Sequence, residues 1–278
     1  MSEYTSFKTG GFAKTLIEPL DNLAVARVIR ALKENGERYF VLGNGTNLLV
    51  SDEGINIPIV YIGKSMSEIT VDGELVTCQA GALLSSVAQR AYKESLSGME
   101  FAHGIPGSVG GAVCMNAGAY GGEMKDIVDW IEYASPTGEL YRMDGDSAQF
   151  AYRKSFFSEK EYVVTRVCLK LNKGNSDEIV AKMKELGKKR REKQPLEYPS
   201  AGSAFKRPEG YFAAALIEEA GLKGVNVGGA AVSEKHSGFI INKDNATSTD
   251  ILNLMELVEK TVYEKFGVKL DREVRCWE

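Results

Sequence analysis

The sequence reads Val41-Leu-Gly-Asn-Gly-Thr-Asn-Leu-Leu-Val50 near its start and Gly104-Ile-Pro-Gly-Ser-Val-Gly-Gly-Ala-Val-Cys-Met-Asn-Ala-Gly118 further along. Each stretch is a glycine-rich turn between apolar, strand-like segments. Glycine lets the backbone adopt positive φ and lets a ligand approach without a Cβ in the way. Successive backbone N–H groups in such turns form anion-binding nests. Two nests together predict a site for a large ligand with a diphosphate in its middle.

Neither stretch matches the common nucleotide signatures. Gly43, Gly45 and Leu48 occupy the three glycine positions of G-x-G-x-x-G, so the third glycine is missing. Gly63-Lys64-Ser65 resembles the end of a Walker A loop, but Pro58 stands where the first glycine is required. The alternative is that both stretches are turns without a ligand, which the entropic cost of ordering long glycine runs disfavours.

The composition is that of a soluble globular protein. The chain has 278 residues, of which 44% are hydrophobic and 26% charged, so two or three subdomains are expected. A net charge of −4 gives no indication of a nucleic-acid partner. No run approaches the roughly 20 apolar residues that span a membrane, and the first residues lack the apolar core of a signal peptide. We therefore expect a cytoplasmic protein with no nucleic-acid or membrane partner. The composition does not indicate the oligomeric state, for which a monomer is the default expectation.

The metal-binding residue types are sparse and scattered. There are two histidines, and the four cysteines form no C-x-x-C pair: Cys78, Cys114, Cys168 and Cys276. No metal site is therefore predicted. Cys78 and Cys168 lie in apolar runs and are expected to be small buried hydrophobic residues.

The hydrophobic pattern predicts an α+β protein in three consecutive parts, residues 1–64, 65–193 and 194–278. The first part is a small α/β unit, with a helix over residues 21–35 capped by Asp21. The second is rich in short alternating strands, and its last residues, 180–193, are basic. That basic run predicts a solvated helix or linker, and it could also help to hold a phosphorylated ligand. The predicted elements not yet named are strands at 39–42, 57–62, 69–71, 75–79, 129–135, 140–143, 162–171, 230–233 and 238–241, and helices at 84–94, 210–220 and 249–266.

Four polar clusters could carry chemistry: Tyr152-Arg153, the turn around Ser203, His236, and Arg272-Glu273-Val-Arg275. Each also has an ordinary explanation, as a surface arginine, a helix-capping serine or outward-facing strand residues. A hydrolase triad is unsupported, because Phe205 replaces the final glycine of G-x-S-x-G and no Asp–His pair is within sequence reach.

Six motifs, in order along essentially the whole chain, make it resemble the UDP-N-acetylenolpyruvoylglucosamine reductases. They are Gly43-Asn-Gly-Thr-Asn-Leu-Leu49, Gly104-Ile-Pro-Gly-Ser-Val-Gly-Gly111, Tyr152-Arg153, Ala201-Gly-Ser-Ala-Phe205, Gly228-Gly-Ala-Ala231 and Glu273-Val-Arg275. The resemblance implies an FAD-binding fold of the vanillyl-alcohol-oxidase type in two α/β subdomains, 1–64 and 65–193. It also implies a third, α+β domain at 194–278 that binds the substrate.

The resemblance assigns a role to individual residues. The proton donor falls on Ser203, and its catalytic partners fall on Arg153 and Glu273. Substrate contacts fall on Lys193, Lys223, His236 and Arg275. Non-covalent FAD would contact Gly43, Asn44, Gly45, Thr46, Asn47, Gly104, Gly107, Ser108, Gly110 and Gly111. The implied reaction uses NADPH as co-substrate and converts UDP-N-acetylglucosamine enolpyruvate to UDP-N-acetylmuramate for peptidoglycan.

The chain departs from parts of the family in two places. Gly210 stands where some members have a lysine, so contacts to the diphosphate must differ. The segment between Arg153 and Pro195 is short and lacks the loop whose tyrosine covers the substrate in one subgroup. The chain therefore resembles the subgroup without that loop, in which a histidine such as His236 is usual.

Two other functions compete with this one. An FAD oxidase could bind flavin covalently through His103, which directly precedes Gly104. Flavin that stays with the protein after acid precipitation would favour that hypothesis. A non-catalytic flavin- or nucleotide-binding module would show a flavin spectrum that NADPH does not bleach.

Overall fold

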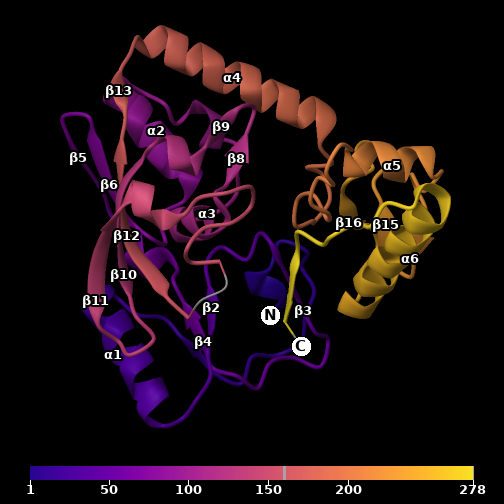
Figure 1. Ribbon diagram of the computed structural model, residues 1–278, viewed down its shortest axis with the longest axis horizontal. Coiled ribbons are helices and arrows are strands. Elements are labelled where there is room, and N and C mark those ends of the chain that lie inside the picture. The colour runs from indigo at the N-terminus through magenta and orange to yellow at the C-terminus, as the bar shows by residue number, and fades with distance from the viewer. Residues whose placement is uncertain (159–160, 278) are drawn as a thin grey trace. The chain divides into compact units, whose positions relative to one another are not determined.

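The computed structural model describes residues 1–158 and 161–277 (Figure 1). The chain forms two compact units whose segments alternate along the sequence. Unit 1 comprises Met1–Lys14, Gly45–Asn56 and Arg191–Glu278, and unit 2 comprises Thr15–Asn44 and Ile57–Arg190. The last crossing lies close to the expected boundary after residue 193. The first two parts of unit 1, however, belong to segments that we expected in an N-terminal domain, and the three-domain division stays a prediction.

Unit 2 is built around a five-stranded antiparallel sheet in the order β11-β10-β12-β6-β5. Its strands are β5 (Ile69–Asp72), β6 (Leu75–Gln79), β10 (Val128–Ala134), β11 (Leu140–Asp144) and β12 (Val163–Lys170). A smaller parallel sheet has the order β1-β4-β2, with bounds Leu16–Ile17, Ile59–Tyr61 and Phe40–Leu42. Two short pairs complete the unit: β7 (Leu96–Ser97) with β13 (Asn172–Lys173), and β8 (Gly118–Ala119) with β9 (Gly122–Glu123).

Three helices belong wholly to unit 2: α1 (Asn22–Glu34), α2 (Leu84–Lys93) and α3 (Val109–Met115). Helix α1 confirms the sequence expectation, because the Asp21 side chain accepts a hydrogen bond from the Ala24 N–H at 2.7 Å and caps it. Its Val25 and Ile29 side chains are fully buried in the core of the unit. In Figure 1, α2 and α3 lie beside the five-stranded sheet, and the contacts between elements place α3 against β12 and α1 against β10. The short 3-10 turns are Ser2–Tyr4, Lys64–Met66, Glu100–Ala102, Met124–Asp126 and Gly145–Ala148.

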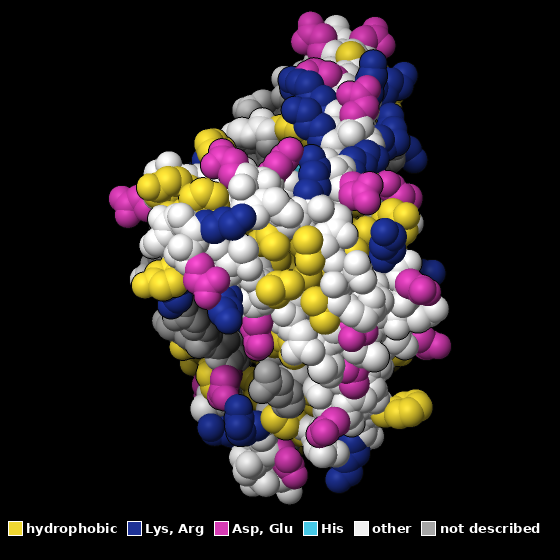
Figure 2. All heavy atoms as spheres, turned by 90° about the vertical axis from the view of Figure 1, so that its right-hand side faces the viewer, with side chains coloured by type: hydrophobic (Ala, Val, Ile, Leu, Met, Phe, Trp, Pro, Cys, Tyr) yellow, Lys and Arg dark blue, Asp and Glu magenta, His cyan; other side chains and the backbone are white. Residues whose placement is uncertain are grey.

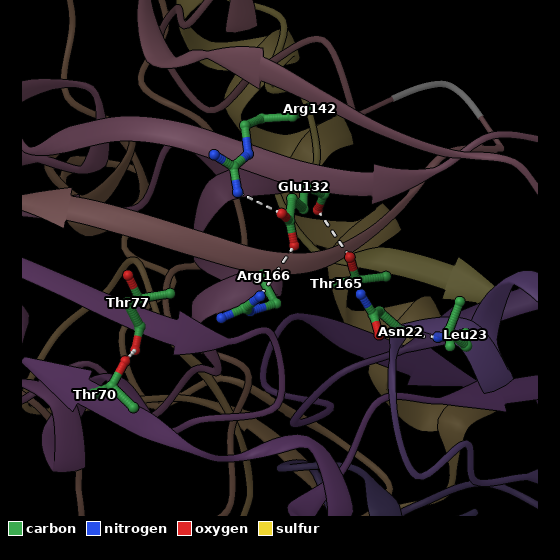
Figure 3. Close-up of polar contacts among 8 residues, drawn as sticks. All are labelled: Asn22, Leu23, Thr70, Thr77, Glu132, Arg142, Thr165 and Arg166. Carbon is green, nitrogen blue, oxygen red and sulfur yellow. Dashed lines mark hydrogen bonds and ion pairs between the residues drawn. The ribbon is translucent and has the colours of Figure 1, made fainter.

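The exposed face of the sheet carries a cross-strand polar ladder (Figure 3). Glu132 accepts a hydrogen bond from Arg142 at 2.7 Å and lies 3.6 Å from Arg166. Thr165 is itself fully buried, and its hydroxyl donates to the Glu132 carbonyl oxygen at 3.1 Å. The exposed Arg–Glu pairs each contribute only about 0.2–1 kcal/mol. The opposite face is apolar, and Ile131 and Val167 on it are fully buried.

Unit 1 packs α5 (Ala213–Glu219) and α6 (Ser248–Phe266) with a three-stranded sheet in the order β14-β15-β16. The strands of that sheet are Asn226–Val227, Ala230–Val232 and Ile240–Asn242. Figure 1 shows α6 lying across β15 and β16. A separate parallel pair joins β3 (Leu48–Val50) to β17 (Arg275–Trp277), so β17 pairs with the last residues of the first glycine stretch.

Helix α6 begins at Ser248, one residue before the expected start at residue 249. Thr247 caps it: the Thr247 hydroxyl accepts from the Asp250 N–H, and the Asp250 carboxylate accepts from the Thr247 N–H at 2.9 Å. The Asp52 carboxylate also accepts hydrogen bonds from the first two backbone N–H groups of the helix, those of Ser248 and Thr249. Within residues 1–158 and 161–277, none of the helices combines the length and hydrophobicity that a membrane span requires.

The basic run at the end of unit 2 belongs to a long helix, α4 (Ser176–Lys193). Its buried residues Ile179, Met183 and Leu186 lie on one stripe, and most of its lysines are exposed, as a solvated helix requires. Figure 2 shows lysine and arginine side chains gathered at the top of the molecule, where α4 lies in Figure 1.

Candidate active site

The two glycine stretches meet inside unit 2. The Asn44 side-chain amide donates a hydrogen bond to the Pro106 carbonyl oxygen. A Cβ built on Gly43 would lie 2.7 Å from the Ser108 hydroxyl oxygen, which is too close for any other residue to fit without a shift. Gly43 and Asn44 therefore lie against the Pro106–Ser108 segment.

The second stretch is held to the loop that precedes α2. The Leu84 N–H donates to the Gly107 carbonyl at 3.0 Å, and the Val109 N–H donates to the Ala82 carbonyl at 2.8 Å. Beyond Ser108 the chain forms α3, although we expected a continuous turn there. Residue 110 of this helix is a glycine because a Cβ there would come within 2.9 Å of the Ala80 Cβ. Close packing against Ala80 therefore accounts for a glycine at this position.

Two polar atoms near this surface suit a ligand. The Ser108 side chain is 2% exposed, and its hydroxyl has no hydrogen-bond partner within residues 1–158 and 161–277. The buried Nδ1 atom of His103 likewise has none in that part of the chain. Buried polar groups almost always have a partner, so such atoms beside the two glycine stretches fit a bound polar group. The site therefore fits the phosphates and polar edge of a flavin dinucleotide.

Gly45 has a structural reason of its own. Its φ is +60°, and a Cβ there would collide with the Tyr4 carbonyl oxygen. The Gly45 carbonyl oxygen also accepts the Ser6 N–H at 3.0 Å. These contacts lie within unit 1, so a bulky substitution at Gly45 would disturb the packing of that unit whether or not a ligand is bound.

Arg190 is a site residue that the sequence reasoning missed. It is half-buried, and its side chain lies against Gly104, where a Cβ would be 3.1 Å from the Arg190 Cδ. Burial lowers the pKa of the guanidinium, and nearby Tyr120 opposes that shift in part. A signal existed, because Arg190 continues the buried stripe of Met183 and Leu186 at helical spacing. It supplies positive charge beside the second glycine stretch.

Arg153 lies on a tight turn in unit 2. The N–H groups of Ala151 and Lys154 each donate to the other's carbonyl oxygen, at 2.9 and 3.1 Å, so Tyr152 and Arg153 form the two-residue tip. Arg153 has φ of 54°, the left-handed region that favours glycine. Its guanidinium carbon lies 5.3 Å from the centre of the Tyr152 ring. The structure thus places Arg153 in a backbone conformation that an arginine adopts at a cost.

Ser203 lies on a short extended strip in unit 1. Ser203 pairs with Phe239 in an antiparallel bridge, and the Ala204 N–H donates to the Gly238 carbonyl at 2.8 Å. On the other side of the strip, the Glu273 N–H donates to the Ala204 carbonyl at 2.8 Å. The strip therefore places the predicted Ser203 and Glu273 on adjacent backbone segments, although they are far apart in the sequence.

Asn47 connects the first glycine stretch to the same region. Its side-chain amide donates to the Glu273 carbonyl at 3.0 Å, and its own carbonyl accepts the Arg275 N–H at 3.1 Å. Asn47 therefore fixes the backbone of Glu273-Val274-Arg275, which gives this predicted cofactor residue a structural role within unit 1. Arg275 is exposed, and Glu273 is half-buried.

His236 and Lys223 lie in one cluster of unit 1 around Glu218. Glu218 accepts hydrogen bonds from the Lys223 ammonium at 2.9 Å and from the Ser237 hydroxyl at 3.0 Å, which lower the pKa of its carboxyl group. Burial lowers the pKa of His236, and Glu218 partly offsets this. The His236 Nδ1 accepts the Gly238 N–H at 3.1 Å, so the neutral ring carries its proton on Nε2.

The remaining predicted residues are placed without a contact that tests their roles. Lys193, the last residue of α4, and Lys223 are exposed. Thr46 is half-buried, and Gly111 lies on the exposed side of α3. In sum, unit 1 gathers Ser203 and Glu273 with Asn47 and Arg275, whereas unit 2 gathers Gly43 and Asn44 with the second glycine stretch.

Two family models match the chain. Residues 13–144 match an FAD binding domain, and residues 194–277 match the C-terminal domain of UDP-N-acetylenolpyruvoylglucosamine reductase. The second match begins at the residue where we expected the substrate-binding domain to begin. The expected α+β fold with an FAD-binding part and a further domain is confirmed.

The similar proteins are also UDP-N-acetylenolpyruvoylglucosamine reductases. The chain is 50% identical to a UDP-N-acetylenolpyruvoylglucosamine reductase of Caldanaerobacter subterraneus subsp. tengcongensis, over 99% of this chain and 91% of that protein. It is equally 50% identical to one of Clostridium novyi, over 99% of this chain and 89% of that protein. The crystal structure of the Thermus caldophilus reductase superposes with a TM-score of 0.85 at 37% identity, covering 100% of this chain and 97% of that one. The chain therefore belongs to the UDP-N-acetylenolpyruvoylglucosamine reductases and is an FAD-dependent oxidoreductase.

Proposed function

We propose that this protein reduces the enolpyruvyl ether of UDP-N-acetylglucosamine to UDP-N-acetylmuramate at the expense of NADPH, and that Ser203 donates the proton. The product is a precursor of peptidoglycan. The relatives that share half of their residues with this chain are named for that enolpyruvyl substrate. FAD, reduced by NADPH and held non-covalently beside Gly43 and Ser108, would supply the hydride that adds to the enolpyruvyl methylene carbon.

Arg153 is proposed to stabilise the negative charge that this addition creates. The charge develops on the carbon next to the methylene group and spreads into the substrate carboxylate. A guanidinium fixed nearby lowers the energy of that state, as the donors of an oxyanion hole do. The left-handed φ of Arg153 supports the role, because strained residues persist where the surrounding structure enforces them and cluster at functional sites.

Ser203 is proposed to protonate that carbon from its hydroxyl. The observation that carries the proposal is the strip that holds Ser203 between Phe239 and the Glu273 segment by backbone hydrogen bonds. A serine hydroxyl is a weak acid in water, so it needs a fixed position and a nearby positive charge to act as the donor. Glu273 is proposed to orient the substrate or to polarise the hydroxyl through a water molecule.

The cationic residues are proposed to bind the anionic parts of the substrate. Arg275, Lys193 and Lys223 would contact its carboxylate or phosphates through charge-assisted hydrogen bonds. His236 would offer its Nε2–H as a neutral donor, because its Nδ1 already accepts the Gly238 N–H. Lys223 already donates one hydrogen bond to Glu218 at 2.9 Å, and the two other N–H groups of its ammonium would serve the substrate.

The proposal is tested by following the flavin spectrum of the purified protein without oxygen. NADPH should bleach the flavin, and UDP-N-acetylglucosamine enolpyruvate should then restore its colour and yield UDP-N-acetylmuramate by mass spectrometry. UDP-N-acetylglucosamine, which lacks the enolpyruvyl group, is the matched control and should restore nothing. A flavin that NADPH does not bleach, or that stays with acid-precipitated protein, would contradict the proposal.

A further inference from the structure

Asn116 connects the second glycine stretch to the turn that carries Arg153. It follows the last residue of α3, has φ of 42°, and is 1% exposed. Asparagine is one of the few residues other than glycine that adopts this left-handed conformation with little cost. The left-handed backbone at the end of the helix therefore explains why an asparagine is tolerated at residue 116. It does not explain why the side-chain amide is buried there.

The amide group of Asn116 joins three segments. Its Nδ2 donates to the Ala151 carbonyl at 3.1 Å and to the Glu123 carboxylate at 2.8 Å. Its Oδ1 accepts the Lys125 N–H at 3.0 Å. Both N–H groups of the buried Asn116 amide and one lone pair of its oxygen are thus used in hydrogen bonds. A buried polar group that is satisfied in this way specifies one arrangement of its partners.

The Arg153 turn is fastened to the same end of α3 at a second point. The Ser155 hydroxyl donates to the Cys114 carbonyl at 3.0 Å, and the Ser158 hydroxyl donates to the same oxygen. The Ser155 N–H donates to the Ser158 hydroxyl at 2.8 Å, so the two serines also hold each other. The turn is therefore held on its far side by two serines and on its near side, at Ala151, by Asn116.

We infer that Asn116 is a positioning residue, which holds the left-handed Arg153 turn against the end of the glycine-bearing helix. Ala151 is the residue whose carbonyl closes the turn by accepting the Lys154 N–H, and Asn116 donates to that same oxygen. Loss of the amide would free one side of the turn and let the Arg153 guanidinium leave its place. The inference rests on the proposed role of Arg153 and names the residue that sets its geometry.

The test uses Asn116→Gly and Asn116→Asp in the FAD-loaded enzyme. Glycine keeps the left-handed backbone and removes all three side-chain hydrogen bonds. Aspartate keeps the shape but places a carboxylate oxygen against the Ala151 carbonyl and Glu123. Asn245→Gly is the matched control, because Asn245 is an exposed asparagine with φ of 49° outside the site.

Both Asn116 variants should slow the return of flavin colour with the enolpyruvyl substrate by roughly 10- to 100-fold, because small displacements of a reacting group cost that much. Bleaching by NADPH should keep its wild-type rate, and Asn245→Gly should change neither. In an Arg153→Ala background, Asn116→Gly should cause no further slowing, since residues that act through one another are not additive. Trypsin should also cut more rapidly after Arg153 and Lys154 in the Asn116 variants, as shown by mass spectrometry of the fragments.

The outcomes separate the inference from the proposed function. If Arg153→Ala slows colour return but the Asn116 variants do not, or slow it additively with Arg153→Ala, Asn116 does not position Arg153. Unchanged trypsin cleavage would also overturn the inference. If Arg153→Ala itself has no effect on colour return, the proposed role of Arg153 is wrong and the inference falls with it.

Discussion

The segment that carries Arg153 and the strip that carries Ser203 are held in place by different means. Side chains hold the Arg153 turn: Asn116 donates to Ala151, and Ser155 donates to Cys114. Backbone groups hold the Ser203 strip, which pairs with Phe239 on one side and with the Glu273 segment on the other. The turn is also strained, since Arg153 has a left-handed φ, whereas Ser203 is not among the residues with positive φ.

This difference predicts how each segment responds to substitution. Backbone pairing does not depend on the side chains of the strip, so Ser203 can change without moving its neighbours. Side-chain hydrogen bonds are lost with a single substitution, so the Arg153 turn is sensitive to residues that never contact substrate. Substitutions in each segment test this difference.

The largest effect is expected for Ser203→Ala. Loss of a positioned general acid typically lowers turnover by about 10²–10⁴-fold. The Michaelis constant and the melting temperature should stay close to those of the wild type, because backbone groups hold the strip. Ser200→Ala, three residues earlier, is the control and should leave turnover unchanged. A large fall in melting temperature for Ser203→Ala would mean that the hydroxyl supports the fold.

Arg153→Gly and Arg153→Ala separate charge from strain. Both remove the guanidinium and should lower turnover by about 10²–10³-fold, as loss of an oxyanion-stabilising donor does. Glycine fits the left-handed φ and alanine does not, a difference of about 1–2 kcal/mol. The glycine variant should therefore melt about 2–8 °C above the alanine variant in calorimetry. Equal melting temperatures would show that the turn relaxes and stores no strain.

Arg275→Ala and Lys193→Ala should mainly raise the Michaelis constant for the UDP substrate. Hydrogen bonds to charged groups contribute about 1.5–3 kcal/mol, which corresponds to roughly ten- to hundred-fold weaker binding. Arg191→Ala is the matched control, since Arg191 is an exposed basic residue beside Lys193. Steady-state kinetics with unchanged Michaelis constants in both variants would remove these two residues from the substrate site.

The smallest effect concerns the acid stability of α6 in unit 1. The pKa of the Asp250 carboxyl is lowered, first by the Thr247 backbone N–H and then by that of Gly229, with burial opposing. A lowered pKa in the folded state means that the contribution to stability is present above the unfolded pKa and is lost as the pH falls through the folded one. Asp250→Asn should therefore melt below the wild type at neutral pH, by an amount that corresponds to about 1 kcal/mol. Below about pH 4, near the ordinary Asp pKa, that gap should narrow; a gap that is constant with pH would exclude the charge as its cause.

Much of the fold follows from local sequence patterns. The Asp21 cap and the strands of the five-stranded sheet were predictable, because periodicity and capping act over a few residues. Burial of Cys78 and Cys168 is confirmed as well, and burial raises the pKa of the Cys78 thiol to about 12. The pairing of β3 with β17 was not predictable, because nothing local in Leu48–Val50 specifies a partner at the end of the chain.

The candidate site, like the fold, could be predicted from the sequence only in part. Motifs indicated Ser203, Arg153 and Glu273, but glycine content alone did not distinguish the causes of each glycine. Gly43 lies close to the Ser108 hydroxyl, whereas Gly45 and Gly110 are required by packing against Tyr4 and Ala80. Helix α3 was missed because glycine disfavours helices, and tertiary packing overrides that preference here. Asn116 was missed because Ala151, whose carbonyl it binds, lies 35 residues further along the chain. Arg190 was missed because the basic run around it predicted a solvated helix.

The most direct test of the central claim, that Ser203 protonates the substrate carbon, is stopped-flow absorbance of the flavin in Ser203→Ala, with each half-reaction measured separately. Transfer of hydride from NADPH needs no acid on the protein, so bleaching should proceed at nearly the wild-type rate. The return of colour with UDP-N-acetylglucosamine enolpyruvate should slow by the factor seen in turnover. If both half-reactions slow equally, or neither slows, Ser203 is not the proton donor and Glu273 becomes the next candidate.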